Sequence, residues 1–224
     1  MTQSTSHGES ESPQGRLLYR GAEADIVRGT WRGLAAVYKV RRPLPYRLAE
    51  LDIAIRRQRT IHEAELFYSA RKAGVRVPRL YYIDVPRTTL VMEYVEGKRL
   101  KELVSSAPEE EAMDLFRALG RDVARLHSAG MTHGDITTAN VIVRDGELVF
   151  IDFGLSTHTF RLEDRAVDLR LIKEILVGAH SEISSMALER LFEGYSKEAG
   201  AKRTKAVMKQ LRNIERRGRY ARLS

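Results

Sequence analysis

The sequence predicts an α+β fold with a β-rich N-terminal lobe and a mainly helical C-terminal lobe. Short apolar runs that alternate with polar residues, as strands do, dominate residues 16–95 around one long helical stretch. After residue 100, apolar residues recur at helical spacing instead. Residues 131–154, MTHGDITTANVIVRDGELVFIDFG, interrupt these helices with a loop and a hairpin. We therefore expect a small bilobal molecule whose functional residues lie in that stretch.

Length and composition limit the class of protein. A chain of 224 residues can bury one good-sized core or two small lobes. It contains no cysteine, which excludes disulfides and thiolate metal sites. It has no apolar run long enough to span a bilayer, and its N-terminus lacks the apolar core of a signal peptide. We therefore expect a cytoplasmic protein without membrane contacts, or a nuclear one as well if the source is eukaryotic.

The N-terminal lobe is predicted to span residues 16–95, after a disordered tail. Residues 1–15 are polar and rich in serine, so they have nothing to bury. Gly21 lies in a GAEA sequence between two apolar runs, for which a hairpin turn is the simplest structure. The run AAVYKV that follows alternates, which puts Lys39 on the same face of a strand as Val37. A lone lysine in such a strand would be a surface residue.

A long helix is predicted at residues 47–73, with Gly74 as its C-terminal signal. Glu63 lies on this helix, and Arg59 one turn earlier would be its ordinary ion-pair partner. His62 is expected to pack against neighbouring side chains. Glu63 is thus a candidate functional carboxylate, and an ordinary surface ion pair with Arg59 is the simpler alternative.

Two strands, at residues 80–83 and 89–95, complete the predicted N-terminal lobe. The C-terminal lobe, residues 96–200, begins with a short helix at 100–104. A longer helix follows, which Pro108 and three glutamates introduce as an early proline and dipole-favoured acids should. Its apolar stripe is expected to be buried and consists of Met113, Phe116, Leu119, Val123 and Leu126.

Residues 131–154 contain three oxygen-bearing side chains in two adjoining loops. Asp135 and Asn140 precede the first strand of the hairpin, and Asp152 follows the second, so the hairpin should return Asp152 to their neighbourhood. Phosphoryl transfer needs positioning and neutralisation of negative charge. Magnesium prefers oxygen ligands, which Asn140 and Asp152 supply, and Asp135 is left to orient the attacking hydroxyl or water and accept its proton. Any one of these residues alone would more often belong to a turn, but together they favour a phosphotransferase.

Two helices and a basic segment are predicted to end the chain. The first of these helices should begin at Asp168, and the second should span residues 183–199. Residues 201–224 contain nine Lys/Arg and one Glu, and the rest of the chain has equal numbers of basic and acidic residues, so the net charge of +8 lies here. A run of charge is usually a solvated face, but this concentration favours contact with nucleic acid. The cations expected to make that contact, in a flexible end of the segment, are Arg216, Arg217, Arg219 and Arg222.

The sequence HGDITTAN followed by DFG resembles the catalytic loop and DFG segment of the protein-kinase-like fold. Gly134 stands where arginine is usual. The resemblance implies ATP and Mg²⁺ as cofactors and a bilobal kinase-like fold. It also implies that Lys39 binds the nucleotide phosphates and that Glu63, with Glu65 as the competing candidate, orients Lys39.

The same resemblance implies the remaining nucleotide contacts. Gly21 would lie in the loop that covers the phosphates, although a glycine-rich motif is not legible there. Met92 would guard the adenine pocket, while the Glu93 carbonyl and the Val95 amide would pair with the base. Asp168 resembles the kinase aspartate that ties its helix to the backbone of the catalytic loop. No A-P-E motif follows DFG, so the usual platform for peptide substrates should be missing.

Over residues 17–222 the assembled motifs resemble one family closely, the small atypical kinase of the KEOPS complex, which is RIO-like and of the PRPK type. The motifs that add to those above are R-x-x-x-E-A at 59–64, E-D-x-A-V-D-L at 163–169 and the basic R-G-R. The resemblance implies an atypical serine/threonine kinase or ATPase in the complex that forms threonylcarbamoyladenosine in tRNA. Its C-lobe would dock on the threonylcarbamoyltransferase subunit and regulate it, its N-lobe would bind a small regulatory subunit, and its basic residues 201–224 would bind tRNA.

Two other functions are compatible with parts of the sequence. Small-molecule phosphotransferases of the aminoglycoside or choline kinase kind share HGD-x-x-x-x-N, but they build a substrate pocket from an acidic helical region after the metal aspartate, where this chain ends in cations. A non-catalytic nucleotide-binding scaffold is the third alternative. A scaffold has no chemical need for Lys39, Asp135, Asn140 and Asp152 together, which favours an enzyme.

Overall fold

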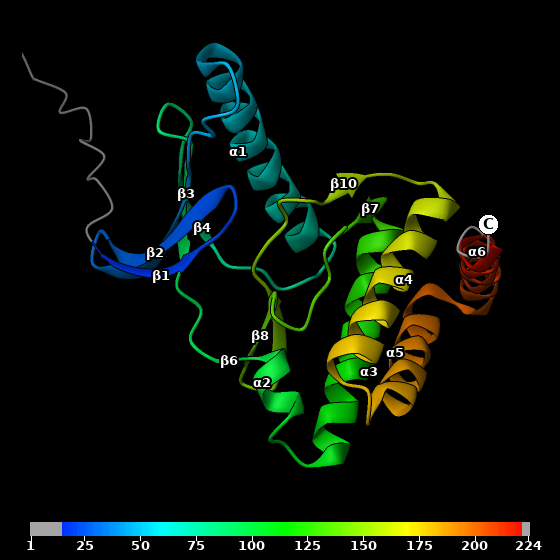
Figure 1. Cartoon of the computed structure of the whole chain (residues 1–224). Coiled ribbons are helices and arrows are strands. Elements are labelled where there is room, and N and C mark those ends of the chain that lie inside the picture. The colour runs from blue at the N-terminus through cyan, green and yellow to red at the C-terminus, as the bar shows by residue number, and fades with distance from the viewer. Residues whose placement is uncertain (1–14, 221–224) are drawn as a thin grey trace, which may run out of the picture. The chain divides into compact units, whose positions relative to one another are not determined.

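The computed structural model describes the backbone of residues 15–220 and the side chains of residues 15–217. The chain divides into two compact units, Met1–Ile61 with Arg79–Tyr94, and His62–Pro78 with Val95–Ser224. The described part of the first unit is mainly β-sheet and that of the second is mainly helical (Figure 1). The predicted α+β class is therefore confirmed. No described helix combines the length and the apolar character needed to cross a membrane.

The N-terminal unit contains an antiparallel five-stranded sheet with the order β1-β2-β3-β5-β4. In register, Lys39 lies between Ile26 and Leu90, so it occupies the middle of a central strand. Ala36, Tyr38 and Val91 form a buried core, and strand alternation puts Lys39 on the other face from Tyr38. The strands are β1 (Arg16–Arg20), β2 (Ala24–Trp31), β3 (Leu34–Arg41), β4 (Leu80–Asp84) and β5 (Thr89–Glu93).

The long helix α1 (Ala49–Lys72) ends before Gly74, which has a φ of 82° as a C-terminal glycine should. Its Arg59 pairs with Glu23 of the β1–β2 turn, and this hydrogen bond lowers the pKa of the Glu23 carboxyl. The contact joins residues 36 positions apart, so it could not be read from helical spacing. His62 is exposed, and the expectation that it packs against neighbours is wrong.

The C-terminal unit is built around α3, whose predicted apolar stripe is buried as expected. Pro108 is the N-cap residue of this helix. The elements of the unit are β6 (Lys98–Arg99), α2 (Leu100–Val104), α3 (Glu109–Ser128), β7 (Met131–Thr132), β8 (Val141–Arg144), β9 (Glu147–Phe150), β10 (Thr157–His158), α4 (Leu162–Ala179), α5 (Ser184–Ala199) and α6 (Ala201–Tyr220). Helix α5 packs on α3 and on α4, and α6 packs on α4 and α5 (Figure 1).

Helices α3 and α5 approach each other through two glycines. A Cβ atom added to Gly120 would lie 1.8 Å from the carbonyl oxygen of Leu191, and one added to Gly194 would lie 1.9 Å from that of Arg117. No real Cβ contact is that short, so the two helix backbones touch at these positions. Glycine within a helix otherwise costs about 1 kcal/mol relative to alanine, and this packing is the compensation.

Two predicted boundaries differ from the structure. Helix α4 begins at Leu162, so Asp168 lies inside it and does not start it. Glu163 and Asp164 occupy the first turn, where the helix dipole favours acids. Helix α6 continues through Tyr220, so the prediction of a flexible end fails for residues 216–220. Its apolar stripe is buried through Val207 and Leu211, and a helix anchored in this way propagates cheaply.

Candidate functional site

The hairpin expected in residues 131–154 is confirmed. Strands β8 and β9 pair in register from Val141 with Phe150 to Arg144 with Glu147. Asp145 and Gly146 form the two-residue turn with φ angles of 54° and 77°, as a type I′ hairpin requires. Beyond the last ladder pair, the Ile151 amide donates to the Asn140 carbonyl over 3.0 Å. The hairpin therefore returns Asp152 to the vicinity of Asn140.

Asn140 links the predicted proton acceptor to the predicted metal site. Its Nδ2 donates to the Oδ2 atom of Asp135 over 3.0 Å and to the Asp135 carbonyl over 3.1 Å. With Nδ2 used in this way, the amide oxygen Oδ1 is the atom that can serve as a metal ligand. The neighbouring Asp152 accepts the Gly154 amide at one carboxylate oxygen, over 2.8 Å. An amide oxygen and a carboxylate are the hard ligands that Mg²⁺ takes, so these residues fit that ion.

Gly134 is required by the path of the catalytic loop. Its φ is 79°, in the left-handed region, and an added Cβ would lie 2.3 Å from the carbonyl oxygen of Leu155. The arginine that is usual at this position in the kinase pattern would meet both the strained φ and the carbonyl. The close approach of Leu155, in the segment that follows DFG, thus explains why glycine replaces the usual arginine at position 134.

Asp168 holds the backbone of the catalytic loop, as the resemblance implied. Its two carboxylate oxygens accept the amides of His133 and Gly134 over 2.8 Å each, and Oδ2 also lies 3.1 Å from Nε2 of His127. Burial alone would raise the pKa of Asp168, but the His127 contact and the His133 amide outweigh burial, and the pKa lies below its ordinary value. Asp168 is therefore an anion that fixes the two residues directly before Asp135.

The His133 side chain has a structural role. Its ring packs against Phe153 and Phe150, with ring centroids 4.9 Å and 5.7 Å away. Neither ring nitrogen has a hydrogen-bond partner within residues 15–217. Burial lowers the pKa of His133 despite nearby carboxylates, so the ring is neutral at pH 7. The neutral imidazole therefore contributes to the packing of the loop as an apolar side chain would.

Glu63 is buried and contacts the DFG segment. Its Oε1 atom accepts the Phe153 amide over 3.4 Å, and the Phe153 ring meets Phe67 of α1 edge-on, with centroids 5.0 Å apart. The predicted role of Glu63 concerned Lys39 alone, and this contact was not expected. The C-terminal half of α1 is thus fastened to DFG by one polar and one aromatic contact.

The other predicted nucleotide contacts belong to different units. Gly21, Lys39, Met92 and Glu93 lie in the N-terminal unit, whereas Val95 begins the second segment of the C-terminal unit. Lys39 is 7% exposed and Met92 is 3% exposed, and both lie on paired strands. The Glu93 side chain accepts the Arg79 amide over 3.1 Å, and the Glu93 backbone pairs with Ala36 of β3. Their joint role in binding a nucleotide stays a prediction.

A cavity of about 610 Å³ adjoins the catalytic loop. His180 lies on one wall, and its Nε2 is 3.1 Å from the Thr138 hydroxyl, while the Lys101 amide donates to the Thr138 carbonyl over 3.0 Å. No local sequence pattern predicts this contact, because Thr138 and His180 are 42 positions apart. The remaining wall residues are Glu102, Ser105, Thr137, Ala139, Ile175 and Ala179.

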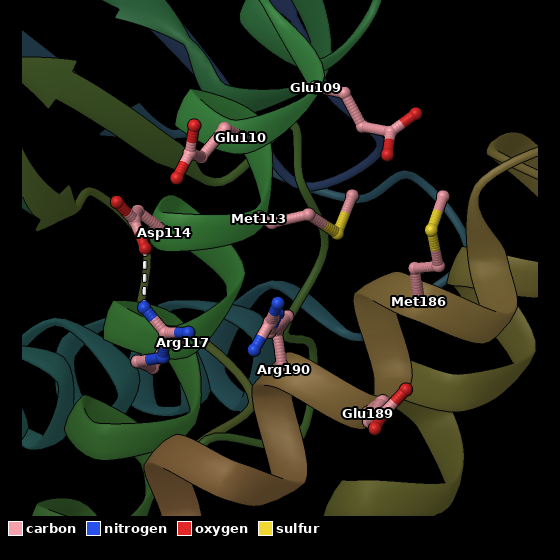
Figure 2. Close-up of a pocket in the computed structure, with 8 residues that line it drawn as sticks. All are labelled: Glu109, Glu110, Met113, Asp114, Arg117, Met186, Glu189 and Arg190. Carbon is pink, nitrogen blue, oxygen red and sulfur yellow. Dashed lines mark hydrogen bonds and ion pairs between the residues drawn. The ribbon is translucent and has the colours of Figure 1, made fainter.

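A second cavity, of about 340 Å³, lies between the start of α3 and the first half of α5. Figure 2 shows Met113 and Met186 facing each other across it, with carboxylates around them. Arg117 is held by Asp114 on its own helix and by Glu193 across the contact. None of the predicted catalytic or nucleotide-binding residues lines this cavity.

The predicted nucleic-acid contacts lie on or beyond α6. Arg216 and Arg217 are exposed. The backbone of Arg219 is helical, its side chain lies outside the described part, and Arg222 lies wholly outside the described residues. Glu215, the one acid of residues 201–224, is paired with Lys173 of α4 over 2.7 Å. The exposed cations of α6 therefore face solvent without a neutralising acid from their own helix.

Comparison with known proteins adds a family to this geometry. A family model described as the RIO domain matches residues 52–167, about half of the chain. The KEOPS complex subunit Bud32 of Pyrococcus abyssi is 37% identical over 211 residues, which cover 92% of this chain and 96% of that protein. A probable bifunctional tRNA threonylcarbamoyladenosine biosynthesis protein of Methanobrevibacter smithii is 40% identical over 91% of this chain, which spans only 36% of that longer protein.

A solved structure has the same fold. The Rio2 kinase of Chaetomium thermophilum, in an ADP/Mg²⁺-phosphoaspartate complex, matches with a TM-score of 0.63 and 19% identity, over 92% of this chain and 70% of that one. At that identity the match concerns the fold, and it agrees with the β-rich and helical units described above. The chain therefore belongs to the RIO-domain family of atypical kinases, in the group of the small KEOPS subunit Bud32.

Proposed function

We propose that this chain is an ATP-dependent phosphotransferase or ATPase that works in the cytoplasm within a KEOPS complex and regulates its threonylcarbamoyltransferase subunit. The observation that carries the proposal is the Asn140 amide, which bonds to the Asp135 carboxylate beside Asp152. Phosphoryl transfer is mainly a matter of positioning and charge neutralisation. A base that is hydrogen-bonded to one magnesium ligand, with the second ligand at the end of the same hairpin, suits that demand.

Each residue has a stated role in this proposal. Asp135 orients the acceptor, a serine or threonine hydroxyl or a water, and takes its proton. Asn140 and Asp152 hold Mg²⁺, which when bound neutralises the phosphate oxygens. Lys39 of the N-terminal unit contacts the phosphates, and Glu63, which belongs to the C-terminal unit, orients Lys39. The remaining contacts to the nucleotide come from Gly21, Met92, Glu93 and Val95.

The hydrogen bonds around Asp135 lower the cost of positioning it. Asn140 holds its side chain, and Asp168 holds the two backbone amides before it. The carboxylate is thus oriented before an acceptor arrives, and reacting groups fixed in advance avoid part of the entropic cost of the step. A proton taken from the acceptor hydroxyl then moves onto a carboxylate whose direction is already set.

Asp152→Asn tests the enzyme assignment, with Asp145→Asn as its matched control. Asp145 is an exposed carboxylate in the turn of the same hairpin, and asparagine tolerates its φ of 54°. With ATP labelled on the γ-phosphate and Mg²⁺ present, Asp152→Asn should lower turnover by roughly 10²–10³-fold, the scale of losing one electrostatic contact to the transition state. Asp145→Asn should leave turnover within about twofold. Equal turnover in the two variants would contradict the metal role of Asp152.

The destination of the label separates the reaction types. Phosphate released to solvent, and more of it when tRNA and the transferase subunit are present, is the expected result for an ATPase of the complex. Label on this chain or on another protein would instead identify a protein kinase. Silence of the wild-type chain under all these conditions would favour the nucleotide-binding scaffold.

Exposed apolar residues support separate partner surfaces on the two units. The C-terminal unit exposes Leu155 and Phe160, the latter 76% exposed, in the segment between DFG and α4. The N-terminal unit exposes Tyr46 and Leu48, the latter 79% exposed, just before α1. We assign the first surface to the transferase subunit and the second to the small regulatory subunit. The longer relative named for bifunctional threonylcarbamoyladenosine biosynthesis supports a close partner of that kind.

Single aspartate substitutions test these two surfaces. Phe160→Asp should abolish co-purification with the transferase subunit and preserve binding of the regulatory subunit, whereas Leu48→Asp should do the reverse. Both side chains are largely exposed, so neither change should disturb folding. Loss of both partners in either variant, or of neither in both, would contradict the assignment.

We also propose that α6 and the residues after it bind tRNA through Arg216, Arg217, Arg219 and Arg222. Support comes from the exposed cations of α6, whose one acid is already paired. In Arg216→Gln/Arg217→Gln, the slope of log affinity against log salt should fall by about 0.7–0.9 per lost phosphate contact. Lys197→Gln removes an exposed cation from α5 and should leave the slope unchanged. Equal slopes in all three proteins would exclude α6 as the contact.

A small-molecule phosphotransferase remains the alternative, and the same assay decides it. The acidic cavity of Figure 2 has the character of a site for a cationic substrate, although no predicted catalytic residue lines it. Added aminoglycoside or choline should therefore leave the fate of the label unchanged. Label transferred to either compound would establish the alternative.

A further inference from the structure

We propose that Tyr195 is a positioning residue for the catalytic loop and acts through His127 and Asp168. The inference rests on the proposed function, in which Asp135 on that loop takes the proton of the acceptor. Tyr195 lies on α5, His127 on α3 and Asp168 on α4. Each of these polar side chains is at most 2% exposed. Three helices thus meet at a buried polar chain, where each group must find its hydrogen bonds internally.

The chain of contacts ends at the reacting segment. The Tyr195 hydroxyl lies 2.9 Å from Nδ1 of His127, and Nε2 of the same ring lies 3.1 Å from Oδ2 of Asp168. That carboxylate accepts the two backbone amides that directly precede Asp135, over 2.8 Å each. Only two side-chain contacts therefore separate the Tyr195 hydroxyl from the backbone of the catalytic loop.

Counting protons gives the hydroxyl a definite task. The pKa of Asp168 is below its ordinary value, so the carboxylate is ionised and can only accept hydrogen bonds. Nε2 of His127 must then carry a proton. An imidazole that carries its one proton on Nε2 presents Nδ1 as an acceptor, which requires a donor. Burial raises the pKa of Tyr195 to about 12, so its hydroxyl keeps its proton and donates to Nδ1.

The hydroxyl thereby selects the tautomer of His127 that serves Asp168. Without it, Nδ1 would be buried and unpaired, and a ring with the proton on Nδ1 would turn an acceptor nitrogen toward an anion. Asp168 would then hold the loop with the amides alone. The tyrosine ring is a separate matter, because it packs edge-on against His127 with centroids 5.5 Å apart, and phenylalanine preserves that packing.

The kinetic test compares Tyr195→Phe with Leu191→Val in the full chain. Leu191 is a buried residue one turn earlier on α5, and its apolar side chain cannot form a hydrogen bond, so its substitution loosens the same helix interface without removing a hydrogen-bond donor. Tyr195→Phe should lower kcat by about fivefold to twentyfold and change the KM for MgATP by less than about twofold, since a displaced Asp135 affects the proton transfer and not the nucleotide contacts. Leu191→Val, with a comparable loss of thermal stability, should keep kcat within about twofold.

The spectroscopic test does not depend on activity. The chain has six histidines, so the ¹⁵N resonances of their rings can be resolved, and His127→Gln identifies those of His127. The wild-type ring should show the proton on Nε2. In Tyr195→Phe the Nε2 resonance should shift toward the unprotonated value, and amide exchange at His133 and Gly134 should become faster.

The outcomes separate this proposal from the proposed function. An unchanged His127 tautomer together with unchanged amide exchange in Tyr195→Phe would overturn the proposal, and so would an equal loss of kcat in Leu191→Val. If the wild-type chain shows no turnover with any partner, the proposed function fails, but the ring and amide measurements still decide the role of Tyr195. A changed tautomer with kcat unaltered would also overturn it, because the hydroxyl would then position nothing that matters for the reaction.

Discussion

Substitution of Gly134 by alanine tests whether the segment after DFG sets the path of the catalytic loop. Alanine at a φ of 79° meets the left-handed penalty of about 1–2 kcal/mol. Its Cβ would also lie 2.3 Å from the Leu155 carbonyl oxygen, about 0.7 Å inside the shortest contact that real Cβ atoms make. Relieving such a clash costs roughly 1–3 kcal/mol, while the stiffer unfolded chain returns about 0.4–1 kcal/mol. We therefore expect the free energy of unfolding to fall by roughly 2–4 kcal/mol.

Gly146→Ala is the matched control, because it isolates the backbone penalty. Gly146 has a φ of 77°, and an added Cβ would meet nothing within 4 Å. Its loss of stability should be about 1 kcal/mol, the left-handed penalty reduced by the gain from a stiffer unfolded chain. The difference between the two variants, roughly 1–3 kcal/mol, is the contribution of the Leu155 contact.

Urea unfolding of the C-terminal unit is the appropriate stability assay. The one tryptophan, Trp31, lies in the N-terminal unit, so its fluorescence would report on the other part of the chain. Far-UV circular dichroism, together with amide exchange in α3 and α5, follows the unit that contains Gly134. Turnover of labelled ATP should also fall, because a shift approaching 1 Å beside Asp135 is of the size that costs about 10²-fold.

Two results would refute this reasoning. Equal destabilisation of Gly134→Ala and Gly146→Ala would mean that the loop and the Leu155 carbonyl do not touch. A destabilised Gly134→Ala with normal turnover would mean that the loop position does not control the orientation of Asp135.

Two further predictions concern the helices of the C-terminal unit. Gly120→Ala should lower the free energy of unfolding by roughly 1–3 kcal/mol, because its Cβ would clash with the Leu191 carbonyl of α5. Gly178→Ala in α4 is the control: the site has open space around it, so the change should be neutral or stabilising by up to about 1 kcal/mol. Equal effects of the two substitutions in urea unfolding would contradict the close approach of α3 and α5. The second prediction concerns Asp122, whose pKa burial raises from 3.8 to about 6 despite the nearby Arg121 and Arg125. Folding therefore favours the protonated form of this carboxyl. The free energy of unfolding consequently rises as the pH falls from above 6 toward 4. Asp122→Asn should remove that contribution, which has a slope of at most about 1.4 kcal/mol per pH unit, and should stabilise the chain at pH 7 by roughly 1–3 kcal/mol; destabilisation at pH 7 with an unchanged slope would show that the ion pairs with arginine dominate instead.

Much of the fold could be predicted because its signals are local. The alternation around Lys39, the apolar stripe of α3 and the Asp145-Gly146 turn each depend on residues a few positions apart. The same locality explains two errors. Asp168 resembles a helix N-terminal acid when only its neighbours are considered, although the helix begins at Leu162. The basic end of the chain resembles a flexible segment, although α6 extends through Tyr220.

The candidate site was predictable in part. Asp135, Asn140 and Asp152 could be identified because a hairpin of known turn type brings its two ends together. The contact of Glu63 with the Phe153 amide gave no signal, since those residues are 90 positions apart. A buried carboxylate on a helix face is a recognisable pattern, but its partner is not.

The sequence by itself predicted most of the elements, the candidate set of Asp135, Asn140 and Asp152, and the family resemblance, all of which depend on residue type and short spacing. Only the tertiary structure decided why Gly134 must be glycine, why Gly120 and Gly194 lie within helices, and which side chain meets His127. These contacts join residues such as His127 and Tyr195, which are 68 positions apart. Their geometry depends on how whole helices pack, because a shift of a few tenths of an ångström between two backbones decides whether a side chain fits between them. No local pattern of residues encodes the distance between two helices.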